Sequence, residues 1–154
     1  MEFIKTSLEG LYVIKHHVHS DDRGGFSRTF CKNEFNSIGF NKEFVQFNHS
    51  FNLKKGTLRG MHFQNMPFCE YKLIRCIEGS VFDVAVDIRK NSPTFLKHFS
   101  IELSSSNFFS ILIPEGFAHG FQTLQDNTSL IYHHTQFFNN KSDAGLLYND
   151  NALS

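Results

Sequence analysis

Residues 58–64 place a cation, an imidazole and an amide on one short β-patterned stretch. By strict alternation Gly60, His62 and Gln64 share one face of such a strand, and Arg59 points the other way unless a β-bulge redirects it. A neutral imidazole suits a general base near pH 7 and is also a common metal ligand. A lone histidine on a strand is more often structural than catalytic, so other polar groups must support a site.

Three other features supply such polar groups. Asp83 and Asp87 alternate with apolar residues on a run too apolar for an ordinary solvated edge, and polar groups inside a barrel must be paired or functional. A second histidine, His119, directly follows the tight turn at residues 114–116. Tyr132 puts a phenol on a late strand, from which it can face the first imidazole across a barrel.

The elements that would position these groups are short β-patterned runs separated by turn signals. Only residues 32–37 look helical, and about ten strands with almost no helix predict an all-β barrel or jelly roll. A length of 154 residues fits one domain over 1–154, and 19 Phe suit a small barrel with large interior side chains. The runs expected to be strands are residues 11–14, 44–49, 58–64, 71–77, 81–88, 97–103, 108–113, 120–123 and 129–138.

Composition excludes several classes of protein. Fifteen Lys and Arg balance fifteen Asp and Glu, so there is no electrostatic footprint for nucleic acid or an acidic membrane. No run approaches the roughly 20 apolar residues that span a bilayer, so no membrane partner is expected. The chain start lacks a signal-peptide hydrophobic region, which predicts the cytoplasm. Three cysteines without a C-x-x-C pair predict reduced, buried thiols.

Several of these motifs together resemble the dTDP-4-dehydrorhamnose 3,5-epimerase family. The resemblance runs in order from about residue 3 to residue 151. It is carried by Asp22-Arg23-Gly24, Gln46-Phe47-Asn48-His49-Ser50, residues 58–64, Lys72-Leu73-Ile74-Arg75-Cys76, residues 81–90 with Ser92-Pro93-Thr94-Phe95, Ile113 to Phe121, and Tyr148-Asn149-Asp150.

The family's fold is a cupin-type double-stranded jelly-roll β-barrel, in agreement with the all-β prediction. Many cupins hold a metal with an H-x-H pair and a distant histidine. Here the pair is His62-Phe63-Gln64, so the second imidazole is absent, and two histidines make a poor transition-metal site. We therefore expect neither a metal nor another cofactor.

The activity implied by the resemblance is epimerisation of a nucleotide-linked, dTDP-type 4-keto-6-deoxyhexose at C3, C5 or both, in deoxysugar and surface-polysaccharide biosynthesis. The ketone acidifies the flanking C–H bonds, because deprotonation gives an enolate. Such an enzyme needs a base on one face, an acid on the opposite face and a cation at the enolate oxygen. The resemblance assigns these roles to His62, Tyr132 and Lys72.

Further site residues follow from the same resemblance. Arg59 and His119 would line the pocket, with Asp83 as a polar neighbour. The match implies that Arg23 and Phe26 bind the nucleotide by reaching across a dimer interface, so a homodimer is expected. An Arg fork suits a pyrophosphate, and an aromatic face suits a base. Positions on the strand that contacts the diphosphate and base match Gln46 and Asn48.

The chain departs from the family pattern at several positions. Arg28 stands where the family has a Glu that helps to read the thymine, and this reversal of charge is expected to alter base preference. Phe138 replaces a tyrosine, and loss of that hydroxyl is expected to bias the reaction to one carbon. His133 and His134 stand where the family often has Lys and a small residue.

The C-terminal end is a further departure. The chain stops at Ser154, before the family segment whose Asp pairs with the base histidine, so we expect that segment to be lacking. Three alternatives follow: another acid such as Asp83 orients the base His62, the activity is weak, or the family's segment continues beyond Ser154.

Two alternative functions stay open. One is a dTDP-4-keto-6-deoxyhexose 3,4-ketoisomerase, which also uses a cupin barrel, a histidine base and an enediol-like intermediate. The other is a non-catalytic sugar-nucleotide-binding cupin, which Arg28 and the short C-terminal end suggest. Solvent deuterium separates them, because only isomerisation moves the carbonyl and a binding protein exchanges no C–H.

Overall fold

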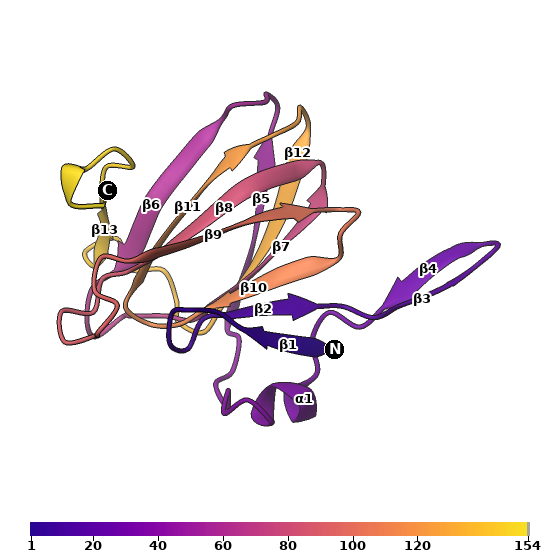
Figure 1. Ribbon diagram of the computed structural model, residues 1–154, viewed down its shortest axis with the longest axis horizontal. Helices are drawn as coiled ribbons and strands as arrows, with labels where there is room; N and C mark the ends of the chain where they lie inside the picture. The colour runs from indigo at the N-terminus through magenta and orange to yellow at the C-terminus, as the bar shows by residue number, and fades with distance from the viewer. Residues whose placement is uncertain (154) are drawn as a thin grey trace.

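The computed structural model describes residues 1–153, and nearly all of their regular structure is β-strand (Figure 1). The helical segments there are α1 (Lys32–Asn36) and the 3-10 turn η1 (Asn151–Leu153). The strands are β1 (Glu2–Lys5), β2 (Tyr12–Lys15), β3 (Val18–Asp21), β4 (Gly24–Ser27), β5 (Gln46–Asn52), β6 (Leu58–Gln64), β7 (Lys72–Glu78), β8 (Ser80–Asp87), β9 (His98–Ser104), β10 (Phe109–Ile113), β11 (Phe117–Thr123), β12 (Thr128–His134) and β13 (Asp143–Gly145).

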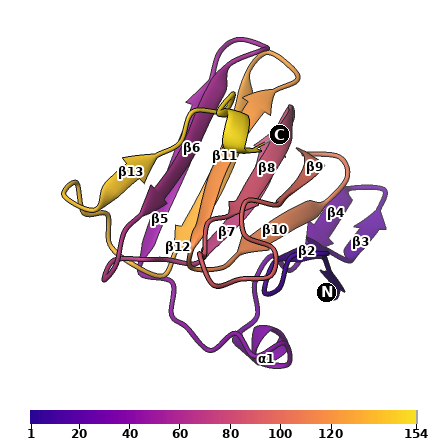
Figure 2. The same cartoon turned by 60° about the vertical axis from the view of Figure 1, so that its left-hand side comes forward.

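Two facing sheets form a jelly-roll-like sandwich (Figures 1 and 2). The six-stranded sheet has the order β1-β2-β10-β7-β12-β5, and the five-stranded sheet has the order β13-β6-β11-β8-β9. The all-β prediction with one short helix is confirmed. Each predicted run coincides with an observed strand, although the run at 129–138 is too long because β12 ends at His134. The short strands β1, β3, β4 and β13 were not predicted, since three or four residues show too little alternation.

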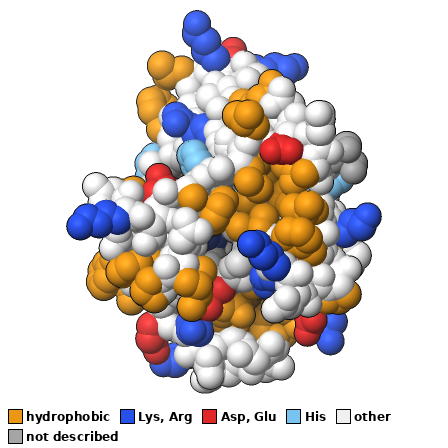
Figure 3. Space-filling model, turned by 90° about the vertical axis from the view of Figure 1, so that its left-hand side faces the viewer, with side chains coloured by type: hydrophobic (Ala, Val, Ile, Leu, Met, Phe, Trp, Pro, Cys, Tyr) orange, Lys and Arg blue, Asp and Glu red, His pale blue; other side chains and the backbone are white. Residues whose placement is uncertain are grey.

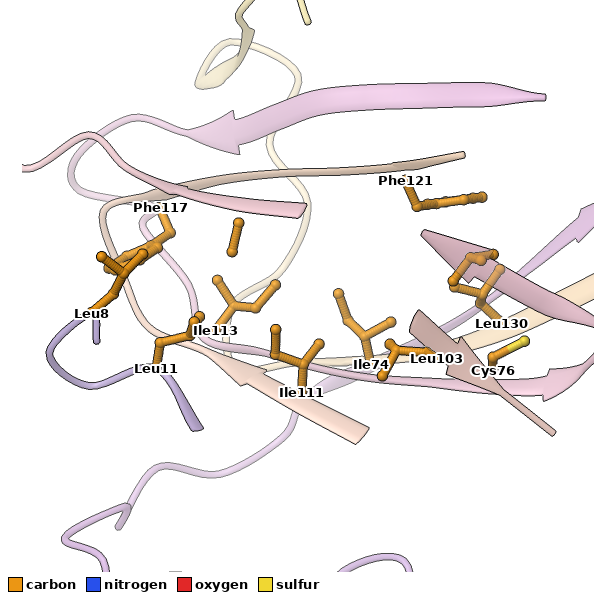
Figure 4. Packing of buried hydrophobic residues seen from close by; sticks show 12 residues of the cluster. Leu8, Leu11, Ile74, Cys76, Leu103, Ile111, Ile113, Phe117, Phe121 and Leu130 are labelled. Atoms are coloured by element: carbon orange, nitrogen blue, oxygen red, sulfur yellow. The ribbon is translucent and has the colours of Figure 1, made fainter. Parts of the chain in front are cut away.

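The core between the sheets is made mostly of aliphatic side chains (Figure 4). On β8 the residues Val81, Asp83, Ala85 and Asp87 are all buried, which confirms that both aspartates face inward. Burial alone would raise the pKa of Asp87, but hydrogen bonds from Arg89, Ser92 and Thr94 hold it well below its usual range. The buried members of this core are Leu8, Leu11, Ile74, Cys76, Val81, Ala85, Leu103, Ile111, Ile113, Phe117, Phe121 and Leu130.

The expectation that most phenylalanines fill the barrel is wrong. Only Phe117 and Phe121 are buried members of the barrel core, whereas a second cluster packs α1 against the outer face of the six-stranded sheet. In that cluster Phe35 is fully buried, with its ring centroid 4.7 Å from Phe30 and 5.2 Å from Phe3. A five-residue helix cannot hold itself, so aromatic burial fixes its position.

Other phenylalanines lie on the surface. Eight of the 19 are exposed: Phe26, Phe30, Phe47, Phe51, Phe82, Phe95, Phe137 and Phe138. Figure 3 shows hydrophobic side chains gathered in patches on the side of the molecule that carries β6 and β13. Contiguous exposed apolar surface is typical of interaction sites.

The hairpin β3–β4 projects away from the sandwich (Figure 1). No strand was predicted in this region, because these two strands bury almost nothing. Phe26 on β4 is 72% exposed although it is a large aromatic residue. The hairpin therefore presents its side chains outward and not to the core of its own chain.

A β-bulge interrupts the pairing of β6 with β11. His62 pairs with His119 and Arg59 pairs with Phe121, so two residues of β6 stand opposite Gly120 alone. Gly60 lies in the bulge with φ of 107°, and a Cβ there would come within 2.5 Å of the Gly120 Cα. The strands can approach this closely only because neither glycine has a side chain.

In the described part of the chain, no helix has the length and apolar character needed to cross a membrane. The three cysteines are free, as predicted, but only Cys76 is buried, while Cys31 and Cys69 are partly exposed. Burial raises the pKa of the Cys76 thiol to about 11, which keeps it protonated.

Replacing Gly60 with alanine tests the bulge. We expect Gly60→Ala to lower the free energy of unfolding by about 3 kcal/mol or more, because left-handed strain adds to a backbone clash. The matched control is Gly39→Ala, since Gly39 has a φ of 83° but no atom within 4 Å of an added Cβ, and it should lose about 1–2 kcal/mol. Urea unfolding measures both, and equal losses would show that β6 and β11 separate freely.

Candidate active site

A cavity of about 300 Å³ lies between the two sheets. One wall comes from β6 and β11 of the five-stranded sheet, and the other comes from β5, β7 and β12 of the six-stranded sheet. It is lined by Asn48, His49, Ser50, Arg59, Gly60, His62, Phe63, Gln64, Glu70, Lys72, His119, Gly120, Phe121, Tyr132, His134, Phe138 and Asp143.

The β-bulge brings both functional side chains of β6 to this cavity. Arg59 and His62 line it together although they are three residues apart, while the intervening Met61 is buried on the other side with Val86 and Ala118. The guanidinium Nε of Arg59 donates to Asn52 Oδ1 at 2.7 Å, so its direction is fixed. The β-bulge that Arg59 needs in order to share a face with His62 is therefore present.

Tyr132 reaches the cavity from β12, on the sheet opposite to His62. Its ring lies edge-on to His119, with centroids 6.0 Å apart, and is stacked on His134 at the same separation. Burial raises the pKa of the Tyr132 phenol well above its usual range, and the Asp83 carboxylate adds to the rise. At neutral pH the phenol is therefore protonated and can donate a proton.

Lys72 opens β7 and is buried, with 8% of its surface exposed. Its ammonium Nζ donates to the backbone oxygen of His62 at 3.4 Å and lies 3.4 Å from Glu70 Oε1. A positive charge thus sits beside the histidine inside the cavity. It is the kind of group that stabilises an oxyanion.

Asp83 partners His119 through a 2.9 Å contact between its Oδ2 and the imidazole Nε2. Its other oxygen, Oδ1, is buried without a hydrogen-bond partner in the described residues. Asp83 thus orients His119, and the structure gives it no bond to His62. A role for Asp83 in the chemistry itself stays a prediction.

Gln64 occupies the position where an H-x-H pair would have its second imidazole. Its amide nitrogen donates to the backbone oxygens of Phe68, at 3.1 Å, and Phe137, at 3.3 Å, and its Oε1 accepts from the Asn139 N–H at 2.6 Å. The side chain therefore ties together the two loops that flank the cavity. No cluster of three or more His, Cys, Asp or Glu able to hold a metal ion occurs in residues 1–153.

The predicted diphosphate strand also reaches the site. Asn48 lines the cavity, and Gln46 donates to Asn48 Oδ1 at 3.3 Å and accepts from the Phe138 N–H at 3.1 Å. Phe138 lies at the rim and is 59% exposed.

The three other predicted nucleotide residues lie outside the cavity of their own chain. Arg23 is exposed at the hairpin and pairs with Asp21 at 2.6 Å, and Phe26 lines the same shallow hollow. Arg28 pairs with Glu34 at 2.9 Å, near the N-terminus. One copy of the chain therefore does not bring these residues to His62.

Among the cavity residues that were not predicted as parts of the site, two form a buried pair with each other. Glu70 and His134 form a pair at 2.8 Å, and their side chains are only 8% and 11% exposed. Glu70 lies in a connection between strands, where the sequence gives no sign that an acid is buried. His134 was noted only as a departure from the family pattern, although its place two residues after Tyr132 on one strand puts both side chains on the same face.

Comparison with known proteins identifies the family. The family model described as dTDP-4-dehydrorhamnose 3,5-epimerase matches residues 5–154. The chain is 43% identical over 155 residues to the enzyme of that name from Shigella flexneri, with 100% of this chain and 85% of the relative covered. It is 42% identical to the enzyme of the same name from Escherichia coli K12, with 100% of this chain and 83% of the relative covered.

Solved structures agree with the sequence relatives. The dTDP-4-dehydrorhamnose 3,5-epimerase from Bacillus anthracis, with TDP and PPi bound, superposes with a TM-score of 0.97 at 37% identity, covering 99% of this chain and 87% of that one. An epimerase from Legionella pneumophila in complex with dTDP-4-keto-L-rhamnose superposes with a TM-score of 0.94 at 37% identity, covering 99% of this chain and 80% of that one. A cavity that combines a histidine, a tyrosine and a lysine, in a chain this similar along its length, makes the protein a member of the dTDP-4-dehydrorhamnose 3,5-epimerase family.

Proposed function

We propose that the protein epimerises a dTDP-linked 4-keto-6-deoxyhexose at C3, C5 or both, in deoxysugar and surface-polysaccharide biosynthesis. The observation that carries the proposal is the placement of His62 and Tyr132 on facing sheets of one cavity. The Lys72 ammonium lines the same cavity and donates to the backbone oxygen of His62. Base and acid on opposite walls are what inversion at a carbon requires.

The reaction follows from this placement. The His62 imidazole removes the proton from a carbon next to the ketone, and the C–H electron pair moves into the carbonyl to give an enolate. The Lys72 ammonium stabilises the enolate oxygen. The Tyr132 phenol then protonates the carbon from the other face. Exchange with water returns His62 and Tyr132 to their starting protonation states.

A homodimer is part of the proposal. The hairpin β3–β4 carries Arg23 and the exposed Phe26 away from the rim of its own cavity, and β5 exposes Phe47 and Phe51 to solvent. A second copy whose hairpin covers this rim would add an Arg fork for the diphosphate and an aromatic face for the base. Arg28 would reach the partner's cavity after its ion pair with Glu34 opens. A cytoplasmic location stays a prediction from the sequence.

The number of carbons inverted forms a finer part of the proposal. Two carbons flank the ketone, and each needs a proton donor on the correct face. Tyr132 provides one hydroxyl, whereas Phe138 at the rim provides none. We propose that the reaction is therefore biased to one carbon. A 3′-monoepimerase from Streptomyces bikiniensis, 26% identical with a TM-score of 0.89, shows that such selectivity exists on this fold.

Deuterium incorporation tests the activity. Incubated with dTDP-4-keto-6-deoxyglucose in D₂O, the protein should incorporate deuterium next to the ketone, as measured by mass spectrometry and NMR. His62→Ala and Tyr132→Phe should slow incorporation by about 10²- to 10⁴-fold, the usual contribution of a general base or acid. The control is His98→Ala, exposed on β9. Tight binding of the substrate without any incorporation would rule out the epimerase.

Mixing two inactive variants tests the shared site. His62→Ala lacks the base, and Arg23→Ala lacks the diphosphate contact that we assign to the partner's hairpin. After random reassociation of equal amounts, half of the dimers hold both chains, and one of their two sites is intact, so about a quarter of wild-type activity should return. Each variant reassociated with itself is the control. A mixture no more active than the separate variants would contradict a shared site.

Restoring a hydroxyl at the rim tests the selectivity. Phe138→Tyr should increase the share of product labelled at both carbons, because a second donor becomes available. Phe137→Tyr is the matched control, since its side chain is 62% exposed and is not part of the cavity wall. The measurement is the ratio of singly to doubly deuterated product. Equal labelling of both carbons by the unchanged protein would show that Phe138 sets no bias.

A further inference from the structure

A continuous path of hydrogen bonds runs from the rim of the cavity to the Lys72 ammonium. Its first link is the Phe138 N–H, which donates to Gln46 Oε1 at 3.1 Å, and Gln46 Nε2 donates to Asn48 Oδ1 at 3.3 Å. Asn48 Nδ2 then lies 3.2 Å from His134 Nε2, and His134 Nδ1 lies 2.8 Å from Glu70 Oε2. Glu70 Oε1 is 3.4 Å from Lys72 Nζ.

The direction of every bond in this path follows from its first link. A backbone N–H can only donate, so Gln46 presents its oxygen to Phe138 and its nitrogen to Asn48. Asn48 in turn presents its nitrogen to His134, whose Nε2 must accept. The ring proton therefore resides on Nδ1 and is donated to the Glu70 carboxylate. His134 is thus assigned as a neutral imidazole that links an amide to an acid.

Glu70 is the only acid in this path, and it is nearly buried. A buried carboxylate is stable only when its oxygens are paired, and here one oxygen takes the His134 proton while the other faces Lys72. An ammonium on a four-carbon stem has three donors and little stiffness of its own. Glu70 and the His62 carbonyl occupy two of those donors, so one remains for a ligand in the cavity that Lys72 lines.

We propose that Glu70 and His134 are positioning residues for the epimerase reaction: His134 holds the Glu70 carboxylate, which fixes the Lys72 ammonium where the enolate oxygen forms. The inference rests on the proposed function. It also joins the strand expected to contact the nucleotide to the group expected to stabilise the enolate. Since the sugar's charge develops only during proton removal, the pair affects the rate of the chemical step more than the affinity for substrate.

The first test is Glu70→Gln, which keeps an oxygen for His134 Nδ1–H but loses the negative charge beside Lys72. We expect kcat for deuterium incorporation from D₂O into dTDP-4-keto-6-deoxyglucose to fall by about 10- to 100-fold, with KM changed less than about threefold, because a displaced oxyanion donor costs this much. The control is Glu102→Gln, exposed on β9. Thermal unfolding shows whether the fold is kept.

Two variants of His134 separate its bond to Glu70 from its bond to Asn48. They also test the positioning role if Glu70→Gln does not fold. His134→Asn places an amide nitrogen near the position of Nδ1 and keeps the bond to Glu70, so kcat should stay within about threefold of wild type. His134→Gln reaches the position of Nε2, keeps Asn48 and loses Glu70, so kcat should fall as it does in Glu70→Gln.

The results distinguish this inference from the proposed function. An active wild-type protein with kcat unchanged in Glu70→Gln and His134→Gln overturns the positioning role and leaves the epimerase standing. A rise in KM alone, or equal losses in both His134 variants with lowered thermal stability, overturns it as well. A wild-type protein that incorporates no deuterium overturns the proposed function itself.

Discussion

The close approach of β6 to β11 is the constraint on which the site depends. Gly60 and Gly120 meet where any side chain would strike backbone, and the pairing shifts by one residue at that point. Without the shift, strict alternation would send Arg59 to the opposite side of the sheet from His62. With the shift, the Arg59 guanidinium and the His62 imidazole line one cavity, and Met61 packs in the apolar layer on the other side of the strand. Two glycines thus determine which face of the strand carries the chemistry.

The sandwich also explains how one small cavity holds groups of opposite function. His62 comes from one sheet and Tyr132 from the other, so a planar ligand between them meets each on a different face. Their environments differ accordingly: Tyr132 is deep enough for burial to raise its pKa, whereas His62 is exposed to solvent along β6. The base is thus in direct contact with water, whereas the acid is largely shielded from it by the surrounding side chains.

Sequence patterns were informative where a feature is local and periodic. Alternation placed β6 and β8 and correctly turned Asp83 inward. The family resemblance implied that His62, Lys72, His119 and Tyr132 share one pocket, and all four line the cavity. Features that depend on tertiary packing were missed. Phe35 falls in the segment expected to be helical, but its packing on the outer face of the sheet was not predicted. Glu70 resembled an ordinary loop acid because its burial is created by strands distant in sequence. The hairpin was overlooked because its side chains have no core to define a pattern.

The clamp made by Gln64 has a consequence for how this lineage can evolve. A single nucleotide change converts a glutamine codon into a histidine codon, which would complete the H-x-H pair of metal-holding cupins. An imidazole has two nitrogens, whereas the Gln64 amide makes three bonds that bind the loops at Phe68, Phe137 and Asn139. The first mutational step toward a metal site would therefore loosen the loops that flank the cavity before a bound ion could stabilise them. Selection for ordered loops would act against that step.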